Sequence, residues 1–253
     1  MLNYELISEW GPIYRDGDKA LKVYAPGKPR GYVAEKARVH ALVHAAGLPV
    51  PAVYGVRKIG ARRNALEMAY IKSEPFIYEG MPGEEREKAL AVMADLQRRI
   101  HAVDAGGFGL PGFSKRIADA IKRTPFLTKQ IKGKALDLLL SLDTGKTNLC
   151  HGDLHPSNIL FDGETHWVID WDGAAMGEPA ADACMTYFYE RRFAPRCADL
   201  YLQAYCANAG VRREEILAWA PVIAAYQVNI KTKDERDFIL KILNEWYEKV
   251  CPN

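Results

Sequence analysis

The sequence has few cysteines, no long apolar run and almost no net charge. Its five cysteines are widely spaced, with no C-x-x-C pair, so a disulfide framework is not predicted. No apolar run approaches the length that crosses a bilayer, and the first residues lack the basic start and apolar core of a signal peptide. The formal charge of +2 provides no basic field for nucleic acid or membranes. We therefore expect a reduced, cytoplasmic protein without nucleic-acid or membrane partners.

The N-terminal part of the chain predicts a small antiparallel sheet with one inserted helix. Residues 6–27 have strand character, and Asp16-Gly17 is a hairpin signal. Residues 31–47 then have helical spacing and end on a glycine, which is a common residue after a helix C-terminus. Strand character returns before residue 71.

From Glu84 onward the pattern is mainly helical. A long amphipathic helix is predicted from Glu84 to a stop near Gly106. Further helical patterns follow at 113–124, at 133–142 and beyond Pro179. These segments are long enough to bury a substantial second core.

The change of pattern sets the predicted domain organisation. The apolar residues of 72–83 follow neither the helical nor the strand repeat, so this segment is expected to form a hinge or linker. We expect an N-terminal lobe at 1–71 and a larger C-terminal lobe at 84–253. The predicted fold class is α+β, with two lobes of which the second is mainly helical.

The stretch CHGDLHPSNILF, at 150–161, is unusually rich in small polar residues between apolar ones. Asp153 precedes Asn158 by five residues, and Pro156 between them argues against a regular helix. A strand, a turn-forming Asp-Gly pair and a return strand follow, which predicts a hairpin ending at Asp170. The hairpin brings Asp170 back near Asn158. Oxygen-bearing side chains in this arrangement suit Mg²⁺, a hard cation that also binds phosphates.

A base aspartate, an asparagine five residues on and a metal aspartate beyond a hairpin form the pattern of a phosphotransferase catalytic loop. Such an enzyme also uses a lysine on an N-terminal strand and a glutamate on the following helix. The strand ALKVY supplies Lys22, which shares a face with Ala20 and Tyr24. The helix supplies Glu35. We expect Lys22 to hold the α- and β-phosphates of a nucleotide and Glu35 to orient Lys22.

HGDLHPSNIL, followed by VIDWDGAAMGEPAAD, resembles the aminoglycoside phosphotransferase-like branch of the protein-kinase-like superfamily. Choline, homoserine and fructosamine kinases share that branch. The resemblance covers nearly the whole chain; it is strongest at 150–182 and clear at 20–56. It implies a bilobal kinase-like fold, with Asp153 as catalytic base and Asn158 and Asp170 as Mg²⁺ ligands.

The resemblance also implies roles for residues outside the metal site. The segment at 67–71 matches the hinge that hydrogen-bonds adenine through its backbone. Asp182 matches an aspartate that braces the catalytic loop, and a plain role at a helix start is an equal alternative. The nucleotide-binding residues implied at the hinge are Glu67, Met68, Ala69 and Tyr70. The remaining residues singled out are His151 for structural support, and His155 and Asp172 for contact with substrate or metal.

Several departures from protein kinases favour a small-molecule acceptor. The usual D-F-G is Asp170-Trp171-Asp172 here, and there is no A-P-E motif or long activation segment. The segment SEWGPIY, which precedes the Lys22 strand, holds only Gly11, where protein kinases have a glycine-rich loop. The phosphate-covering loop is thus expected to be shorter or to depend less on glycine.

The sequence therefore predicts a phosphotransferase that uses ATP or GTP with Mg²⁺. It moves the γ-phosphoryl group to a hydroxyl of a small molecule. A sugar, an amino alcohol or an aminoglycoside stays open as acceptor, because a fold does not fix a substrate. Two other hypotheses stay open: a small atypical Ser/Thr protein kinase, and a nucleotide-binding scaffold without turnover.

Overall fold

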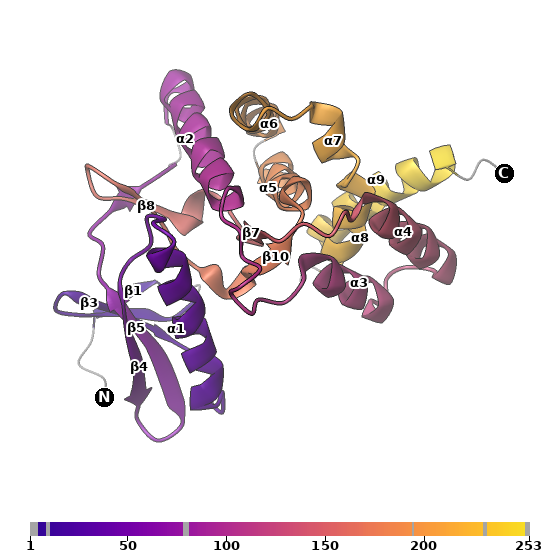
Figure 1. Cartoon of the computed structure of the whole chain (residues 1–253). Helices are drawn as coiled ribbons and strands as arrows, with labels where there is room; N and C mark the ends of the chain where they lie inside the picture. Colours follow the sequence, from indigo (N-terminus) through magenta and orange to yellow (C-terminus); the bar gives the residue numbers. More distant parts are fainter. Residues whose placement is uncertain (1–4, 9–10, 78–80, 194, 230–231, 251–253) are drawn as a thin grey trace. The chain divides into compact units, whose positions relative to one another are not determined.

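The computed structural model describes residues 5–8, 11–77, 81–193, 195–229 and 232–250 (Figure 1). The chain forms two compact units. Unit 1 comprises residues 1–79 and 156–172, and unit 2 comprises residues 80–155 and 173–253. The hairpin that follows the predicted catalytic loop thus groups with the N-terminal sheet, whereas the sequence analysis assigns it to the C-terminal lobe. Within the predicted linker, residues 78–80 lie outside the described residues.

Unit 1 is built on a five-stranded antiparallel sheet with the strand order β1-β2-β3-β5-β4. Its strands are β1 (Glu5–Ser8), β2 (Ile13–Asp16), β3 (Lys19–Val23), β4 (Val53–Ile59) and β5 (Arg63–Ala69). The Asp-Gly signal forms the β2–β3 hairpin, in which Asp16 pairs with Lys19. Gly17 has φ 64°, in the left-handed region that glycine adopts without steric cost.

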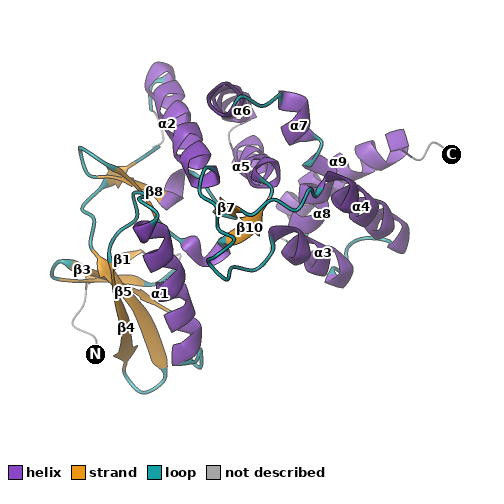
Figure 2. Cartoon of the chain, in the orientation of Figure 1, coloured by secondary structure: helices purple, strands orange, loops and turns teal. Residues whose placement is uncertain are grey.

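One helix packs on this sheet (Figure 2). Helix α1 (Arg30–Ala45) contacts β4 and β5 and buries Val33, Val39 and Val43. The predicted stop is correct, because the helix ends just before Gly47, which has φ 80°. The apolar side chains of α1 and the sheet therefore form the core of unit 1.

A separate three-stranded sheet completes unit 1, in the order β6-β8-β9. Its strands are β6 (Glu74–Pro75), β8 (Ile159–Phe161) and β9 (His166–Val168). The predicted hairpin is confirmed, since β8 and β9 are antiparallel and Ile159 pairs with Val168. Single 3-10 turns flank the hairpin: η1 (Pro156–Asn158) precedes it and η2 (Trp171–Gly173) follows it.

Unit 2 is mainly helical (Figure 2). A short antiparallel pair, β7 (Asn148–Cys150) with β10 (Ala175–Gly177), accompanies the helices. Its helices are α2 (Gly83–His101), α3 (Phe113–Arg123), α4 (Lys129–Leu142), α5 (Pro179–Phe193), α6 (Pro195–Ala209), α7 (Arg213–Leu217), α8 (Ala220–Gln227) and α9 (Lys233–Val250). None of the described helices combines the length and the apolar character needed to cross a lipid bilayer. The α+β class predicted from the sequence is confirmed.

Helix α2 ends earlier than its amphipathic pattern predicts. The last helical residue is His101 instead of a residue near Gly106. The segment after it pairs with the chain beside β7: Ala105 N–H donates to the Thr147 carbonyl at 2.7 Å, and Leu149 N–H donates to the Val103 carbonyl at 2.8 Å. These long-range backbone hydrogen bonds satisfy groups that a longer helix would have used.

A buried carboxyl on α5 should make stability depend on pH. Glu190 is only 4% exposed, and its Oε1 has no hydrogen-bond partner among the described residues. Burial raises the pKa of Glu190 from 4.5 to about 7, although Arg86 opposes the shift. Between these values the folded protein keeps a proton that the unfolded chain releases, so the free energy of unfolding should fall as pH rises.

We expect Glu190→Gln to remove this fall in the free energy of unfolding at rising pH. At pH 8 the variant should exceed the wild type by up to about 3 kcal/mol in the free energy of unfolding, and near pH 4 the two should agree. Denaturant unfolding across this range measures the difference. Glu87→Gln, which changes an exposed carboxyl of α2, is the control for the loss of one charge. Equal pH slopes for the wild type and Glu190→Gln would contradict the prediction.

Candidate active site

Strand β3 carries Lys22 on the face of the sheet that packs against α1. Ala20 and Tyr24 lie on this face and share an apolar cluster with Val33 of α1. Leu21 and Val23 belong to a different cluster, as the two-residue period of a strand requires. The predicted orientation of Lys22 is therefore the one in the structure.

The β8–β9 hairpin brings Asn158 and the chain next to Asp170 together. Asn158 ends the turn before β8 and is 7% exposed. The backbone N–H of Ile169 donates to the Asn158 carbonyl at 2.9 Å. Twelve sequence positions separate Asn158 and Asp170. The hairpin register places Asn158 opposite Ile169, so the chain returns to Asn158 directly before Asp170, as the sequence predicts.

Asp170 has an unusual backbone conformation. Its φ of 62° is the one positive φ of a non-glycine residue in the described chain. An aspartate in the left-handed region costs about 1 kcal/mol or more, and such conformations persist mainly at functional sites where the surrounding structure enforces them. The indole of Trp171, 1% exposed, donates to the Val168 carbonyl at 3.2 Å and holds the chain directly after Asp170.

Lys22 makes ion pairs with two aspartates. Its Nζ lies 2.8 Å from Asp170 Oδ1 and 2.9 Å from Asp172 Oδ2. Burial disfavours the ammonium charge, but the two carboxylates outweigh it and raise the pKa of Lys22. The lysine therefore stays cationic. The Tyr24 hydroxyl donates to Asp172 Oδ1 at 3.1 Å, and burial followed by the Asp172 charge raises the pKa of Tyr24.

The predicted ion pair between Lys22 and Glu35 is not present in the structure. Glu35 instead makes two hydrogen bonds with Arg38, at 2.6 and 2.8 Å, and its side chain is 53% exposed. The next residue of α1, Lys36, reaches the site: its Nζ donates to the Asp172 carbonyl at 2.8 Å. Successive helix residues point about 100° apart, so the orientation of α1 selects Lys36 and turns Glu35 toward solvent.

The hinge residues predicted to bind adenine are engaged in the sheet instead. Glu67, Met68 and Ala69 belong to β5, which pairs with β3 on one side and β4 on the other. The N–H of Ala69 donates to the Ala52 carbonyl, and the N–H of Tyr70 donates to the Asp18 carbonyl. These backbone donors are not available to a nucleotide. Among the described residues, Ile71 is the first after β5 whose N–H has no hydrogen-bond partner.

The side chain of Glu67 is hydrogen-bonded to two basic side chains of the sheet. It accepts hydrogen bonds from Lys19 at 2.7 Å and from Arg57 at 2.7 and 2.9 Å. These contacts, with Arg57 first, lower the pKa of Glu67 to about 2. The carboxylate is therefore committed to an ion network across strands β3, β4 and β5.

In unit 2, the loop that carries Asp153 is tied to α5. Asp182 lies in the first turn of α5 and is fully buried. Its carboxylate accepts hydrogen bonds from the backbone N–H groups of His151, at 3.0 Å, and Gly152, at 2.8 Å. This is the bracing contact that the family resemblance implies. Thr186, one turn further along α5, donates to the Leu154 carbonyl at 3.0 Å.

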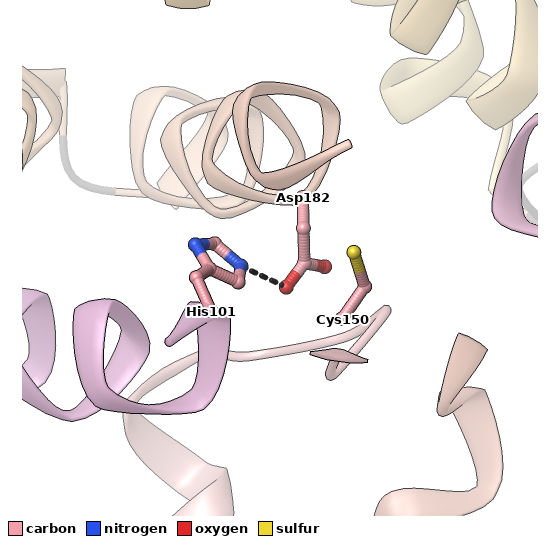
Figure 3. Close-up of side chains that lie close together, drawn as sticks. All are labelled: His101, Cys150 and Asp182. Carbon is pink, nitrogen blue, oxygen red and sulfur yellow. Dashed lines mark hydrogen bonds and ion pairs between the residues drawn. The ribbon is translucent and has the colours of Figure 1, made fainter. Parts of the chain in front are cut away.

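Helix α2 supplies further partners of Asp182 (Figure 3). His101 Nε2 lies 2.9 Å from Asp182 Oδ2, and its Nδ1 lies 2.6 Å from the Tyr205 hydroxyl. Gln97 donates to Asp182 at 3.2 Å. Burial opposes the charge of Asp182, but the hydrogen bond and charge of His101, followed by His151 and the Gly152 amide, keep its pKa below the ordinary value. The buried carboxylate is therefore ionised and fully hydrogen-bonded.

His101, Cys150 and Asp182 lie close enough together to hold a metal ion, and Figure 3 shows them around one point. Both ring nitrogens of His101 and both carboxylate oxygens of Asp182 are already hydrogen-bonded. Burial raises the pKa of the Cys150 thiol, which disfavours the thiolate form that binds metals. The cluster therefore supports the loop structurally.

Asp153 itself is accessible, with 63% of its side chain exposed. The nearby His155 has its Nε2 3.9 Å from Asp153 Oδ2. The His155 ring stacks on Tyr189 of α5, with ring centres 4.3 Å apart and planes 8° apart. The predicted contact of His155 with a substrate stays a prediction. The chain passes from Asp153, in unit 2, to Asn158 and Asp170, in unit 1, at the peptide bond after His155.

The residues that hold these side chains in place are not predicted from the sequence. In unit 1 they are Tyr24 and Lys36; in unit 2 they are Gln97, His101 and Thr186. The sequence holds one signal. Gln97 with His101, and Asp182 with Thr186, are polar pairs four residues apart, and the first pair lies on the apolar face of the amphipathic α2. Such pairs lie on one helix face, and buried polar groups need partners.

Comparisons with known proteins identify the family of the chain. Residues 13–217 match the model of the phosphotransferase enzyme family, APH, and the chain belongs to that family. No curated protein sequence matches the chain closely enough to count as a relative.

Three similar solved structures illustrate the shared fold. A thermostable mutant of aminoglycoside phosphotransferase APH(4)-Ia, in complex with AMP-PNP and hygromycin B, is 17% identical, with a TM-score of 0.71 and coverage of 100% of this chain and 95% of that one. A choline/ethanolamine kinase family protein from Mesorhizobium loti is 19% identical, with a TM-score of 0.67 and coverage of 98% and 88%. An aminoglycoside-3'-phosphotransferase of type VIII is 22% identical, with a TM-score of 0.62 and coverage of 88% and 93%. At these identities, the likeness shows the fold alone.

Proposed function

We propose that this protein transfers the γ-phosphoryl group of ATP or GTP to a hydroxyl group of a small molecule. The observation that carries the proposal is the ion pair between Lys22 and Asp170, at 2.8 Å, beside Asn158 on the same hairpin. A cationic lysine next to two side chains whose oxygens can bind a divalent cation is the arrangement that binds a polyphosphate. In unit 2, a braced loop presents the exposed Asp153 carboxylate.

The residues of this chain divide the chemistry between them. Asp153 accepts the proton of the acceptor hydroxyl as the hydroxyl oxygen forms its bond to the γ-phosphorus. The bond between the γ-phosphorus and the bridging oxygen breaks, and the nucleoside diphosphate leaves with that oxygen. Lys22 pairs with phosphate oxygens and stabilises the negative charge on them. Positioning supplies much of the rate, because the transition state is loose.

The donor set of the hairpin fits a divalent cation. Asn158 contributes an amide oxygen and Asp170 a carboxylate, and the side chain of Asp170 is 40% exposed. Oxygen donors of this kind, few in number and next to a phosphate site, suit Mg²⁺. When bound, the cation would neutralise phosphate charge.

The solved relatives support the choice of ligands. Structures of related proteins are complexes with AMP-PNP, ADP or GDP, and some also hold hygromycin B or streptomycin. A purine nucleotide and a hydroxylated small molecule are therefore the classes to test first. The absence of a long activation segment in the sequence favours a small acceptor over a protein acceptor.

The proposal is tested by measuring nucleotide consumption with Mg²⁺ and either ATP or GTP. The acceptor panel should hold hygromycin B, streptomycin, choline, ethanolamine and simple sugars, and mass spectrometry should detect a phosphorylated product. We expect nucleotide turnover that at least one small hydroxyl compound stimulates. Phosphate transfer to peptide serines alone, or failure to bind either nucleotide, would contradict the proposal.

A further inference from the structure

Two neighbouring charged residues of α1 are candidates to act on the lysine site. Glu35 is committed to Arg38 by hydrogen bonds of 2.6 and 2.8 Å, and half of its side chain is exposed. Lys36 is half-buried and donates to the backbone carbonyl of Asp172 at 2.8 Å. Helix α1 therefore contacts the segment after Asp170 through Lys36. Its Glu35 contacts Arg38 on the same helix and does not contact Lys22.

Asp172 is held at three points. Its Oδ2 accepts from Lys22 at 2.9 Å, its Oδ1 accepts from the Tyr24 hydroxyl at 3.1 Å, and its carbonyl accepts from Lys36. Its neighbour Trp171 is buried and hydrogen-bonded to the chain of β9. A carboxylate fixed in this way has little freedom to leave Lys22.

We propose that Asp172, rather than Glu35, is the carboxylate that orients Lys22 for nucleotide binding. Tyr24 and Lys36 are positioning residues that act through Asp172. The proposal rests on the proposed function, since it concerns the lysine that binds the nucleotide. Asp170 also contacts Lys22, but Asp170 is in addition the candidate metal ligand, whereas both oxygens of Asp172 are used by this chain's own side chains. Asp172 is thus the partner of Lys22 whose two carboxylate oxygens are both hydrogen-bonded within this chain.

The pairing can be tested without nucleotide. The protein is treated with a limiting amount of an amine-reactive succinimidyl ester, and mass spectrometry measures the modification of Lys22 relative to the exposed Lys134. Loss of a carboxylate partner frees the amine, so Asp172→Asn should raise the modification of Lys22 by about three- to tenfold. Glu35→Gln should change it by less than about twofold.

Nucleotide affinity gives the second measurement. We expect Asp172→Asn to weaken the calorimetric Kd for ATP with Mg²⁺ by about tenfold, because one charge-assisted hydrogen bond that orients Lys22 is lost. Glu35→Gln should have a much smaller effect. The proposal is overturned if Glu35→Gln equals or exceeds Asp172→Asn in both assays. If the wild type binds neither ATP nor GTP, the proposed function fails, and the labelling result still decides which carboxylate holds Lys22.

The two positioning residues have matched tests. Lys36→Met should raise the labelling of Lys22 and weaken nucleotide binding, Lys36→Arg should restore both, and Arg38→Met, two positions along α1, should change neither. Tyr24→Phe should weaken nucleotide binding in the wild type but add nothing to Asp172→Asn, since its hydroxyl acts through Asp172. Additive effects of Tyr24→Phe and Asp172→Asn, or equal effects of the Lys36→Met and Arg38→Met changes, would contradict the assignment.

Discussion

An Asp153→Asn variant is expected to lose phosphoryl transfer by a factor of about 10²–10⁴, the usual contribution of a positioned general base. Asparagine keeps the size of the side chain but cannot accept the proton of the acceptor hydroxyl. The loop should stay in place, because its hydrogen bonds to Asp182 and Thr186 come from the backbone of neighbouring residues. Nucleotide affinity and thermal stability should therefore remain close to those of the wild type.

Steady-state kinetics with the best acceptor of the panel, together with calorimetric nucleotide binding, separate these effects. A lower kcat with an unchanged nucleotide Kd is the expected signature of a group that acts only in the chemical step. Asp137→Asn, at an exposed position of α4, controls for the loss of one carboxylate in unit 2. Unchanged turnover in Asp153→Asn would remove Asp153 from the mechanism.

The second large effect is expected from Gly152→Ala. Gly152 has φ +79°, and a Cβ there would overlap the Gly173 carbonyl oxygen and lie 2.9 Å from its carbon. That carbonyl cannot retreat easily, because the guanidinium of Arg116 is hydrogen-bonded to it and, at 2.8 Å, to the carbonyl of Ala174. Backbone strain and steric overlap together should destabilise unit 2 by about 3–5 kcal/mol.

A second glycine separates the two contributions. Gly145 has φ +78°, but a Cβ there would meet nothing within 4 Å. Gly145→Ala therefore isolates the conformational strain, which should cost only about 1 kcal/mol. Chemical unfolding measures both variants. If the two substitutions have the same cost, the close approach of Gly152 to Gly173 is not a constraint on the fold.

Local signals in the sequence were enough to predict the elements that carry the site. The Asp-Gly pairs at 16–17 and 162–163 each specify a tight turn, and both hairpins form. The β8–β9 hairpin then follows from chain geometry alone, and it carries Asp170 back to Asn158. The helical period and the glycine stop predicted α1, because both depend on residues close together in the chain.

Hydrogen bonds between residues far apart in sequence could not be predicted in the same way. The end of α2 is decided by hydrogen bonds between the segment after His101 and the chain beside β7. Residues 67–69 pair with strands on both sides of β5, and the N–H groups of Ala69 and Tyr70 are hydrogen-bonded to the carbonyls of Ala52 and Asp18. The buried contacts of Asp182 with His101 join residues that lie far apart in sequence. No local pattern encodes such pairings.

By itself the sequence determined the α+β class, the order of the main strands and helices along the chain, and the residue types expected at a phosphotransferase site. The tertiary structure decided which of these residues meet. In the folded chain, the orientation of α1 lets Lys36 contact Asp172, while Glu35 contacts Arg38. Lys22 contacts the carboxylates of Asp170 and Asp172. The physical reason is that the period of a helix fixes which residues share a face, whereas packing against the sheet fixes where that face points.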